Sequence, residues 1–139
     1  MGKTILKIDD EVYDFILIGI VSTFRDFRIC RDINSALELD LQRANDYTIT
    51  DAKRNAEIGF SFFEYFTEQE DQYFVITNKG EEGLLIPERK QLDYFLLIKP
   101  GMTPIDASDI IKKLQTVSGF QGIFPIDVRT LKSKGNLLF

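Results

Sequence analysis

Apolar positions in this chain fall into short runs separated by polar turns, and two segments show helical spacing. Apolar side chains recur every three or four residues over about residues 24–37, and again over about residues 106–117. This spacing is typical of an amphipathic helix that packs one face against a core. The first helix is expected to bury a stripe made of Phe27, Cys30, Ile33, Asn34 and Leu37. The second is expected to bury Ile110, Ile111, Leu114 and Val117.

Shorter apolar runs that are rich in β-branched and aromatic residues predict strands. These runs lie at residues 4–8, 14–21, 39–42, 57–67, 72–77, 93–99 and 120–127. The clearest supersecondary unit is a hairpin formed by the two runs 57–67 and 72–77. Residues 43–55 are polar and carry little periodicity, so we expect them to form an irregular connection.

The order of these elements predicts an α+β fold. A strand, a helix and a strand follow one another between residues 93 and 127, which favours a right-handed βαβ unit near the C-terminus. Together with the hairpin this gives a mixed, mostly antiparallel sheet of about six or more strands with two principal helices. No linker or internal repeat divides the 139 residues, so residues 1–139 are expected to form a single domain.

The strand at residues 57–67 is apolar on both of its faces. Its aromatic side chains alternate, with Phe60, Phe62 and Phe66 on one face and Phe63 and Tyr65 on the other. A strand of this kind needs cover on both sides, and two helices on one side leave the other bare. Three covers stay open: curvature of the sheet, the polar segment 43–55, or a second copy of the chain in a homodimer. The apolar residues 137–139 are expected to dock on the body of the protein or on a partner.

The composition removes several kinds of catalytic chemistry. The chain has no histidine and one cysteine, Cys30. Catalysis by Ser-His-Asp or Cys-His groups is therefore excluded within one chain, and zinc is disfavoured because its sites use histidine or several cysteines. Cys30 falls on the predicted buried stripe, where a thiol is usually an inert core group. No catalytic residue, metal site or cofactor is predicted, and enzyme activity is disfavoured without being excluded.

Net charge, the length of the apolar runs and the cysteine content together predict a cytoplasmic protein that does not generally bind nucleic acid. The formal net charge is −5, which repels a phosphate backbone. A basic cluster near the C-terminus, made of Arg129, Lys132 and Lys134, leaves RNA binding as a weaker hypothesis. The longest uncharged apolar run, residues 15–24, is too short to span a membrane, and the first residues lack the pattern of a signal peptide. With a single cysteine, these features predict a reducing cytoplasm and no membrane partner.

The most distinctive stretch is residues 86–94, which read Ile-Pro-Glu-Arg-Lys-Gln-Leu-Asp-Tyr. A proline-stiffened turn here leads into a core strand. Glu88 and Asp93 would be able to converge and share a proton or hold Mg²⁺, with the Tyr94 phenol at the strand entrance. The favoured alternative is that both carboxylates accept backbone N–H bonds and fix the turn, while Tyr94 packs.

Arg28 is a further candidate binding residue. It lies with Arg25 and Arg31 at three-residue spacing on the first predicted helix, so these side chains would be able to bind an anionic ligand or partner. The favoured alternative is a solvated helix face on which the arginines pair with Asp26 and Asp32.

Residues 86–94 also resemble the signature of the IPExxxVDY family, a group of small uncharacterised proteins from Bacteroidetes. Leu92 stands where the family name has valine, a change that keeps a buried aliphatic side chain. Looser likeness covers the stretches FILIGIVS and FRDFRICRDIN and the final LKSKGNLLF. The resemblance implies a small cytoplasmic bacterial protein and implies no particular activity.

These observations favour a protein of unknown function that acts as a non-enzymatic interaction or regulatory module with an unidentified protein partner. The alternative is a small-molecule or Mg²⁺-binding protein, or a carboxylate-based enzyme, centred on Glu88, Asp93 and Tyr94. RNA binding through the C-terminal basic cluster is the weaker alternative.

Overall fold

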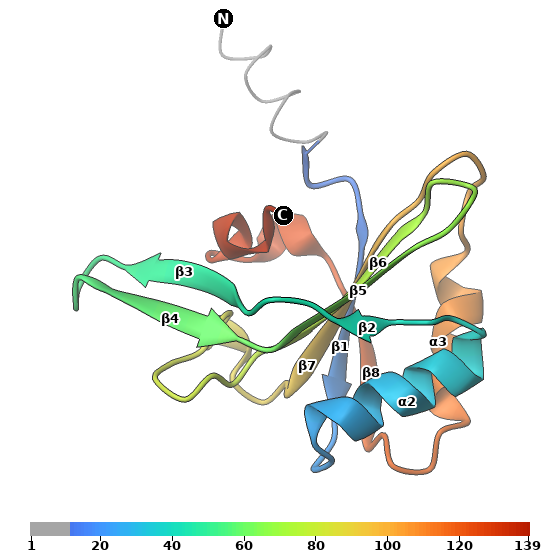
Figure 1. Cartoon of the computed structure of the whole chain (residues 1–139), viewed down its shortest axis with the longest axis horizontal. Coiled ribbons are helices and arrows are strands. Elements are labelled where there is room, and N and C mark those ends of the chain that lie inside the picture. The colour runs from blue at the N-terminus through green and yellow to red at the C-terminus, as the bar shows by residue number, and fades with distance from the viewer. Residues whose placement is uncertain (1–11) are drawn as a thin grey trace, which may run out of the picture.

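The computed structural model describes residues 12–139, and the strand expected at residues 4–8 lies outside them. Two principal helices, α2 (Asp26–Leu37) and α3 (Ala107–Gln115), fall within the two predicted helical segments. The strands are β1 (Ile16–Val21), β2 (Gln42–Arg43), β3 (Tyr47–Asp51), β4 (Ala56–Phe60), β5 (Phe62–Phe66), β6 (Gln72–Thr77), β7 (Tyr94–Lys99) and β8 (Gly122–Ile126). Three short 3-10 helices are η1 (Pro87–Arg89), η2 (Val128–Thr130) and η3 (Lys134–Leu137). The predicted α+β class is confirmed (Figure 1).

Six of the strands form one sheet in the order β2-β5-β6-β7-β1-β8, and every neighbouring pair is antiparallel. Strand β1 lies between β7 and β8, so Ile18 pairs with Leu96 on one side and with Pro125 on the other. Because β7 and β8 are both antiparallel to β1, they run parallel to each other and α3 joins them. The predicted βαβ unit is therefore present, with β1 inserted between its two strands.

The segment expected to be an irregular connection forms strand β3 instead. Strand β3 pairs with β4 in a separate two-stranded sheet that projects from the main sheet (Figure 1). The single strand predicted over residues 57–67 is accordingly divided at Ser61 into β4 and β5, which belong to different sheets. The prediction was wrong because only Tyr47 and Ile49 are large apolar residues in β3, and their alternation with threonine is a weak signal.

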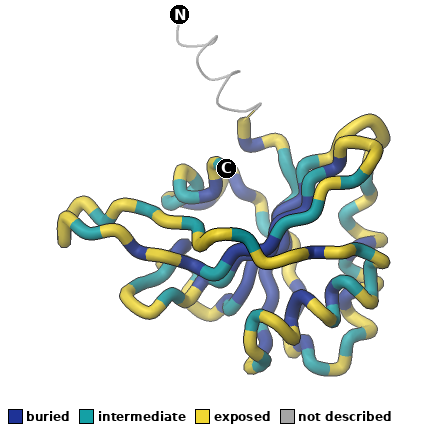
Figure 2. The backbone as a smooth tube through the Cα atoms, in the orientation of Figure 1, coloured by how far each residue is buried: buried dark blue, intermediate teal, exposed yellow. Residues whose placement is uncertain are grey.

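One face of the main sheet is covered by the two helices. Ile29, Cys30 and Ile33 of α2 pack in one cluster with Ile110 and Leu114 of α3 and with the alternate side chains of the central strands. Figure 2 shows this burial along the middle of the sheet.

One member of the predicted stripe is wrong, because Phe27 is 69% exposed and Ile29 is fully buried in its place. The rings of Phe27 and Phe63 meet edge to face, with ring centroids 6.0 Å apart.

The opposite face is covered by the chain itself. Ile58 and Phe60 of β4 pack with Leu85, Ile86 and other buried side chains in a second cluster. The tail after β8 adds buried residues from η2 and η3 to this cluster, namely Val128, Leu131 and Leu137. The sequence left three possible covers open, and one of them, the segment 43–55, contributes strand β3 of the β3–β4 hairpin to this layer. The C-terminal tail completes the layer.

The last residues of the chain dock on this second face, as expected. Leu137 is fully buried, and the Phe139 ring lies among Tyr47, Phe62 and Phe74 with centroid distances of 4.8–5.1 Å. The Lys99 ammonium group donates to the main-chain oxygen of Phe139. The helices of the described chain, at twelve and nine residues, are shorter than a membrane span requires.

Candidate functional site

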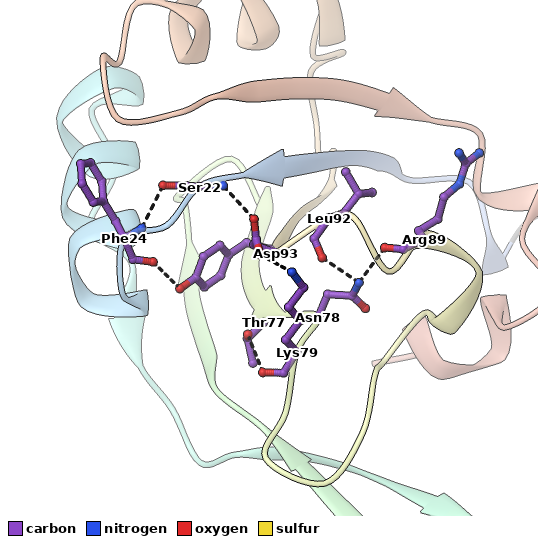
Figure 3. Close-up of polar contacts among 9 residues, drawn as sticks. Ser22, Phe24, Thr77, Asn78, Lys79, Arg89, Leu92 and Asp93 are labelled. Atoms are coloured by element: carbon purple, nitrogen blue, oxygen red, sulfur yellow. Dashed lines mark hydrogen bonds and ion pairs between the residues drawn. The ribbon is translucent and has the colours of Figure 1, made fainter.

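Residues 86–94 wrap around one fully buried polar side chain, that of Asn78. The Asn78 amide nitrogen donates to the main-chain oxygens of Arg89 and Leu92, both at 2.9 Å (Figure 3). Its amide oxygen accepts from the Ile86 amide at 2.8 Å. The main chain of Asn78 adds bonds to Leu85 and Asp93. Asn78 therefore supplies the hydrogen bonds that an irregular loop lacks, and so fixes the path of the motif.

Asp93 ties the end of the motif to the turn that precedes α2. One of its carboxylate oxygens accepts from the Ser22 amide at 2.9 Å, and the other lies 2.7 Å from the Lys79 ammonium nitrogen (Figure 3). Ser22 is itself buried, and its hydroxyl donates to the Gly119 carbonyl at 2.8 Å. Asp93 thus joins three segments that are distant in the sequence.

Tyr94 is buried at the start of β7, with 8% of its surface exposed. Its phenol donates to the Phe24 carbonyl at 2.7 Å. Burial, reinforced by the negative charges of Asp26 and Asp93, raises the pKa of Tyr94 to about 12. Tyr94 is therefore a protonated donor at neutral pH, and this environment does not suit it to proton transfer.

Glu88 bonds to the C-terminal tail and shares no partner with Asp93. Its two carboxylate oxygens accept from the amide and the hydroxyl of Ser133, at 2.7 and 2.8 Å. Its slight burial acts to raise the pKa of Glu88, but hydrogen bonds from the backbone and from Ser133 outweigh burial and hold that pKa below its ordinary value. Glu88 and Asp93 share no bonding partner, and residues 12–139 contain no cluster of three or more potential metal ligands.

Arg28 lies on the exposed face of α2, and Cys30 lies on its buried face. The Arg28 guanidinium stacks over the Phe24 ring at 3.8 Å and lies 3.8 Å from the Asp32 carboxylate, as the solvated-face interpretation expects. Burial raises the pKa of the Cys30 thiol well above its usual range, so this thiol is unreactive at neutral pH.

An open cleft of about 540 Å³ lies beside the motif. It is bounded by the first turn of α2, by β4, by the turn after β6 and by the start of β7, where Tyr94 contributes to its wall. The ionisable lining residues are Arg25, Asp26, Asp46, Glu57, Lys79, Glu81, Glu82 and Tyr94. Carboxylates outnumber cations, and the ammonium of Lys79 is already paired with Asp93. The cleft is therefore suited to a cationic ligand or surface.

The residues of the predicted basic cluster lie in different surroundings. Lys134 lies over the Tyr13 ring at 5.0 Å, and the intervening Ser133 is bound to Glu88. Lys132 is exposed. RNA binding through these residues stays a prediction.

Sequence reasoning missed Asn78, Lys79, Ser22 and Ser133. The side chain of each of these residues bonds to a partner elsewhere in the chain, which no local pattern indicates. The cleft was also missed, because its lining comes from separate segments that only the fold brings together.

Comparisons with protein-family models, with curated proteins and with solved structures found no significant match. The resemblance of residues 86–94 to the IPExxxVDY family therefore stays a prediction, and the functional interpretation depends on the geometry alone.

Proposed function

We propose that this chain is a non-enzymatic, cytoplasmic interaction module that binds a protein partner through the acidic cleft. The observation that carries the proposal is that the candidate reactive groups connect segments of the chain by hydrogen bonds. Glu88, Asp93 and Tyr94 each make a hydrogen bond to another segment of the chain, which supports a structural role for all three. The motif supports the cleft wall, and the cleft is the open polar surface beside it.

The charges of the cleft define the partner. Glu57, Glu81 and Glu82 are exposed on its rim, and no ion pair engages any of them within residues 12–139. Unpaired charges of one sign steer association with surfaces of opposite sign. The partner is therefore expected to present lysine or arginine side chains.

The test is affinity capture from a lysate of the organism that encodes the chain. Wild-type protein, the cleft variant Glu81→Lys/Glu82→Lys and the control variant Lys112→Glu/Lys113→Glu serve as baits. The control reverses two exposed charges on α3, away from the cleft. A specific partner should be recovered with the wild type and the control and be reduced about tenfold with the cleft variant, because each 1.4 kcal/mol is a factor of ten. Equal recovery with all three baits, or no specific protein, would contradict the proposal.

A second candidate is a small cationic ligand in the same cleft, favoured by its size and by the excess of carboxylates in its lining. Mg²⁺ and spermidine are the probes. Either should raise the melting temperature of the wild type and of the α3 control, and should leave the Glu81→Lys/Glu82→Lys variant unchanged. No shift with either probe would remove this candidate.

A further inference from the structure

The outer face of α2 combines exposed cations with an exposed aromatic ring. The side chains of Arg28 and Arg31 are 52% and 72% exposed, and Phe27 is 69% exposed. Both guanidinium groups share one carboxylate, that of Asp32, at 3.8 Å each. The face therefore keeps a positive excess beside a large apolar side chain that is mostly exposed in the described chain.

This basic face adjoins the acidic cleft. Arg25 and Asp26 open α2 and form one wall of the cleft, so the next turns of the helix, which carry Arg28 and Arg31, continue away from it. The other walls of that cleft come from β4 and from the turn that follows β6. One copy of the chain thus presents two adjoining surfaces of opposite charge.

We propose that the partner of the cleft is a second copy of this chain, with α2 of each copy lying against the cleft of the other. This inference rests on the proposed function and names its partner. A two-fold axis applies the same contact twice, so the basic helix of each protomer meets the rim carboxylates of the other. Such a contact needs two surfaces of opposite charge on each copy. The basic face of α2 and the acidic cleft meet this need, because each basic face then lies against an acidic cleft.

Phe27 supplies the apolar part of the interface. An aromatic side chain surrounded by charged groups is a typical anchor, because burying it on binding removes its surface from water while the charges fix the register. The Phe27 ring contacts Phe63 edge-on, which holds it in place before binding. The dimer contact therefore centres on Phe27, with Arg28 and Arg31 towards the partner's cleft.

The test is sedimentation velocity of the wild type and of two charge-reversed variants. Arg28→Glu/Arg31→Glu and Glu81→Lys/Glu82→Lys should each weaken the dimer at least about tenfold, whereas Lys112→Glu/Lys113→Glu should not. An equimolar mixture of the two weakened variants should restore dimers, because every contact between them again joins opposite charges. Arg31→Glu alone serves as a second helix variant that leaves the stacking of Arg28 on Phe24 intact.

Phe27→Ser gives an independent arm of the experiment, with Met102→Ser as its control because the two residues are equally exposed. Only Phe27→Ser should weaken the dimer. A wild type that stays monomeric at about 500 µM, or a mixture that stays monomeric, would overturn the inference. The outcome is separable from the proposed function, since a monomer that still captures a foreign partner through Glu81 and Glu82 keeps the function and loses the dimer.

Discussion

The two faces of the main sheet are covered in different ways. The helix-covered face is closed by α2 and α3, whose buried residues recur with helical spacing. The opposite face is closed by the β3–β4 hairpin, the loop that contains η1, and the tail that contains η2 and η3. Hydrogen bonds of polar side chains hold this second cover in place. Asn78 accepts from Ile86, Glu88 accepts from Ser133, and Asn136 donates to the Leu85 carbonyl.

The contrast separates two sources of stability. A helix satisfies its own backbone hydrogen bonds, so its attachment depends mainly on apolar burial. Loops and tails leave backbone groups unsatisfied, so a buried polar residue must bond to them. We therefore expect the second face to depend strongly on a few single polar residues, and the following changes test that expectation.

Replacement of Asn78 by alanine should have the largest effect. It leaves buried partners of the amide unsatisfied, and the free energy of unfolding should fall by about 4 kcal/mol. Urea denaturation followed by circular dichroism measures the change. Asn136→Ala is the control, because its side chain makes one hydrogen bond and should cost about 1 kcal/mol. Similar losses in the two variants would contradict the central role of Asn78.

Removal of residues 137–139 should come next. Leu137 is fully buried and Phe139 lies in the aromatic cluster, so the deletion should cost about 3 kcal/mol and lower the melting temperature by several degrees. Leu138→Ala is the matched control, since Leu138 is half exposed and should change little. Scanning calorimetry gives both values, and an unchanged melting curve for the truncated chain would refute docking of the tail.

Tyr94 on the helix-covered face should give an alkaline signature. Its folded-state pKa of about 12 lies above the ordinary value of 10.0, so the folded protein holds the phenol proton more tightly than the unfolded chain. The contribution of Tyr94 to the free energy of unfolding is therefore complete below pH 10.0. It falls by about 2 kcal/mol as the pH rises towards about 12. Tyr94→Phe should remove that part of the pH dependence and cost about 1 kcal/mol at neutral pH. Denaturation midpoints across this range measure the slope, which should be shallower in the variant.

Glu88 should give the smallest effect. Because the pKa of Glu88 is lowered in the folded state, its contribution to stability is complete above the ordinary value of 4.5 and is lost as the pH falls below 4.5 through the lower folded-state pKa. Glu88 is exposed, so Glu88→Gln should cost about 0.5 kcal/mol and speed amide exchange at Ser133. Glu82→Gln is the control with no tail contact. Identical exchange at Ser133 in the two variants would show that Glu88 does not hold the tail.

The same contrast explains what the sequence could predict. Periodicity located both helices and most strands of the main sheet, because each signal is local. Phe27 was misplaced because an exposed aromatic residue at the start of a helix shares the spacing of the buried stripe. Strand β3 and the division at Ser61 were missed because threonine-rich alternation is weak and one apolar run supplied two sheets.

The candidate site was predictable only in part, for a related reason. The motif at residues 86–94 stood out by its residue types, but its bonding partners are distant in the sequence. Nothing local to Glu88 indicates Ser133, and nothing local to Asp93 indicates Ser22. A long-range hydrogen bond between single residues leaves no periodic trace.

The position of β1 has a consequence for how the chain acquires this structure. Residue 18 pairs with residues 96 and 125, so β1 is synthesised early and its neighbours in the sheet are synthesised late. Long-range pairings of this kind slow folding, because the intervening chain must be ordered before they form. Until β8 leaves the ribosome, one edge of β1 has no neighbouring strand, and its apolar side chains lack the neighbours that β8 supplies. A chain stalled before β8 would therefore expose them and be prone to aggregate.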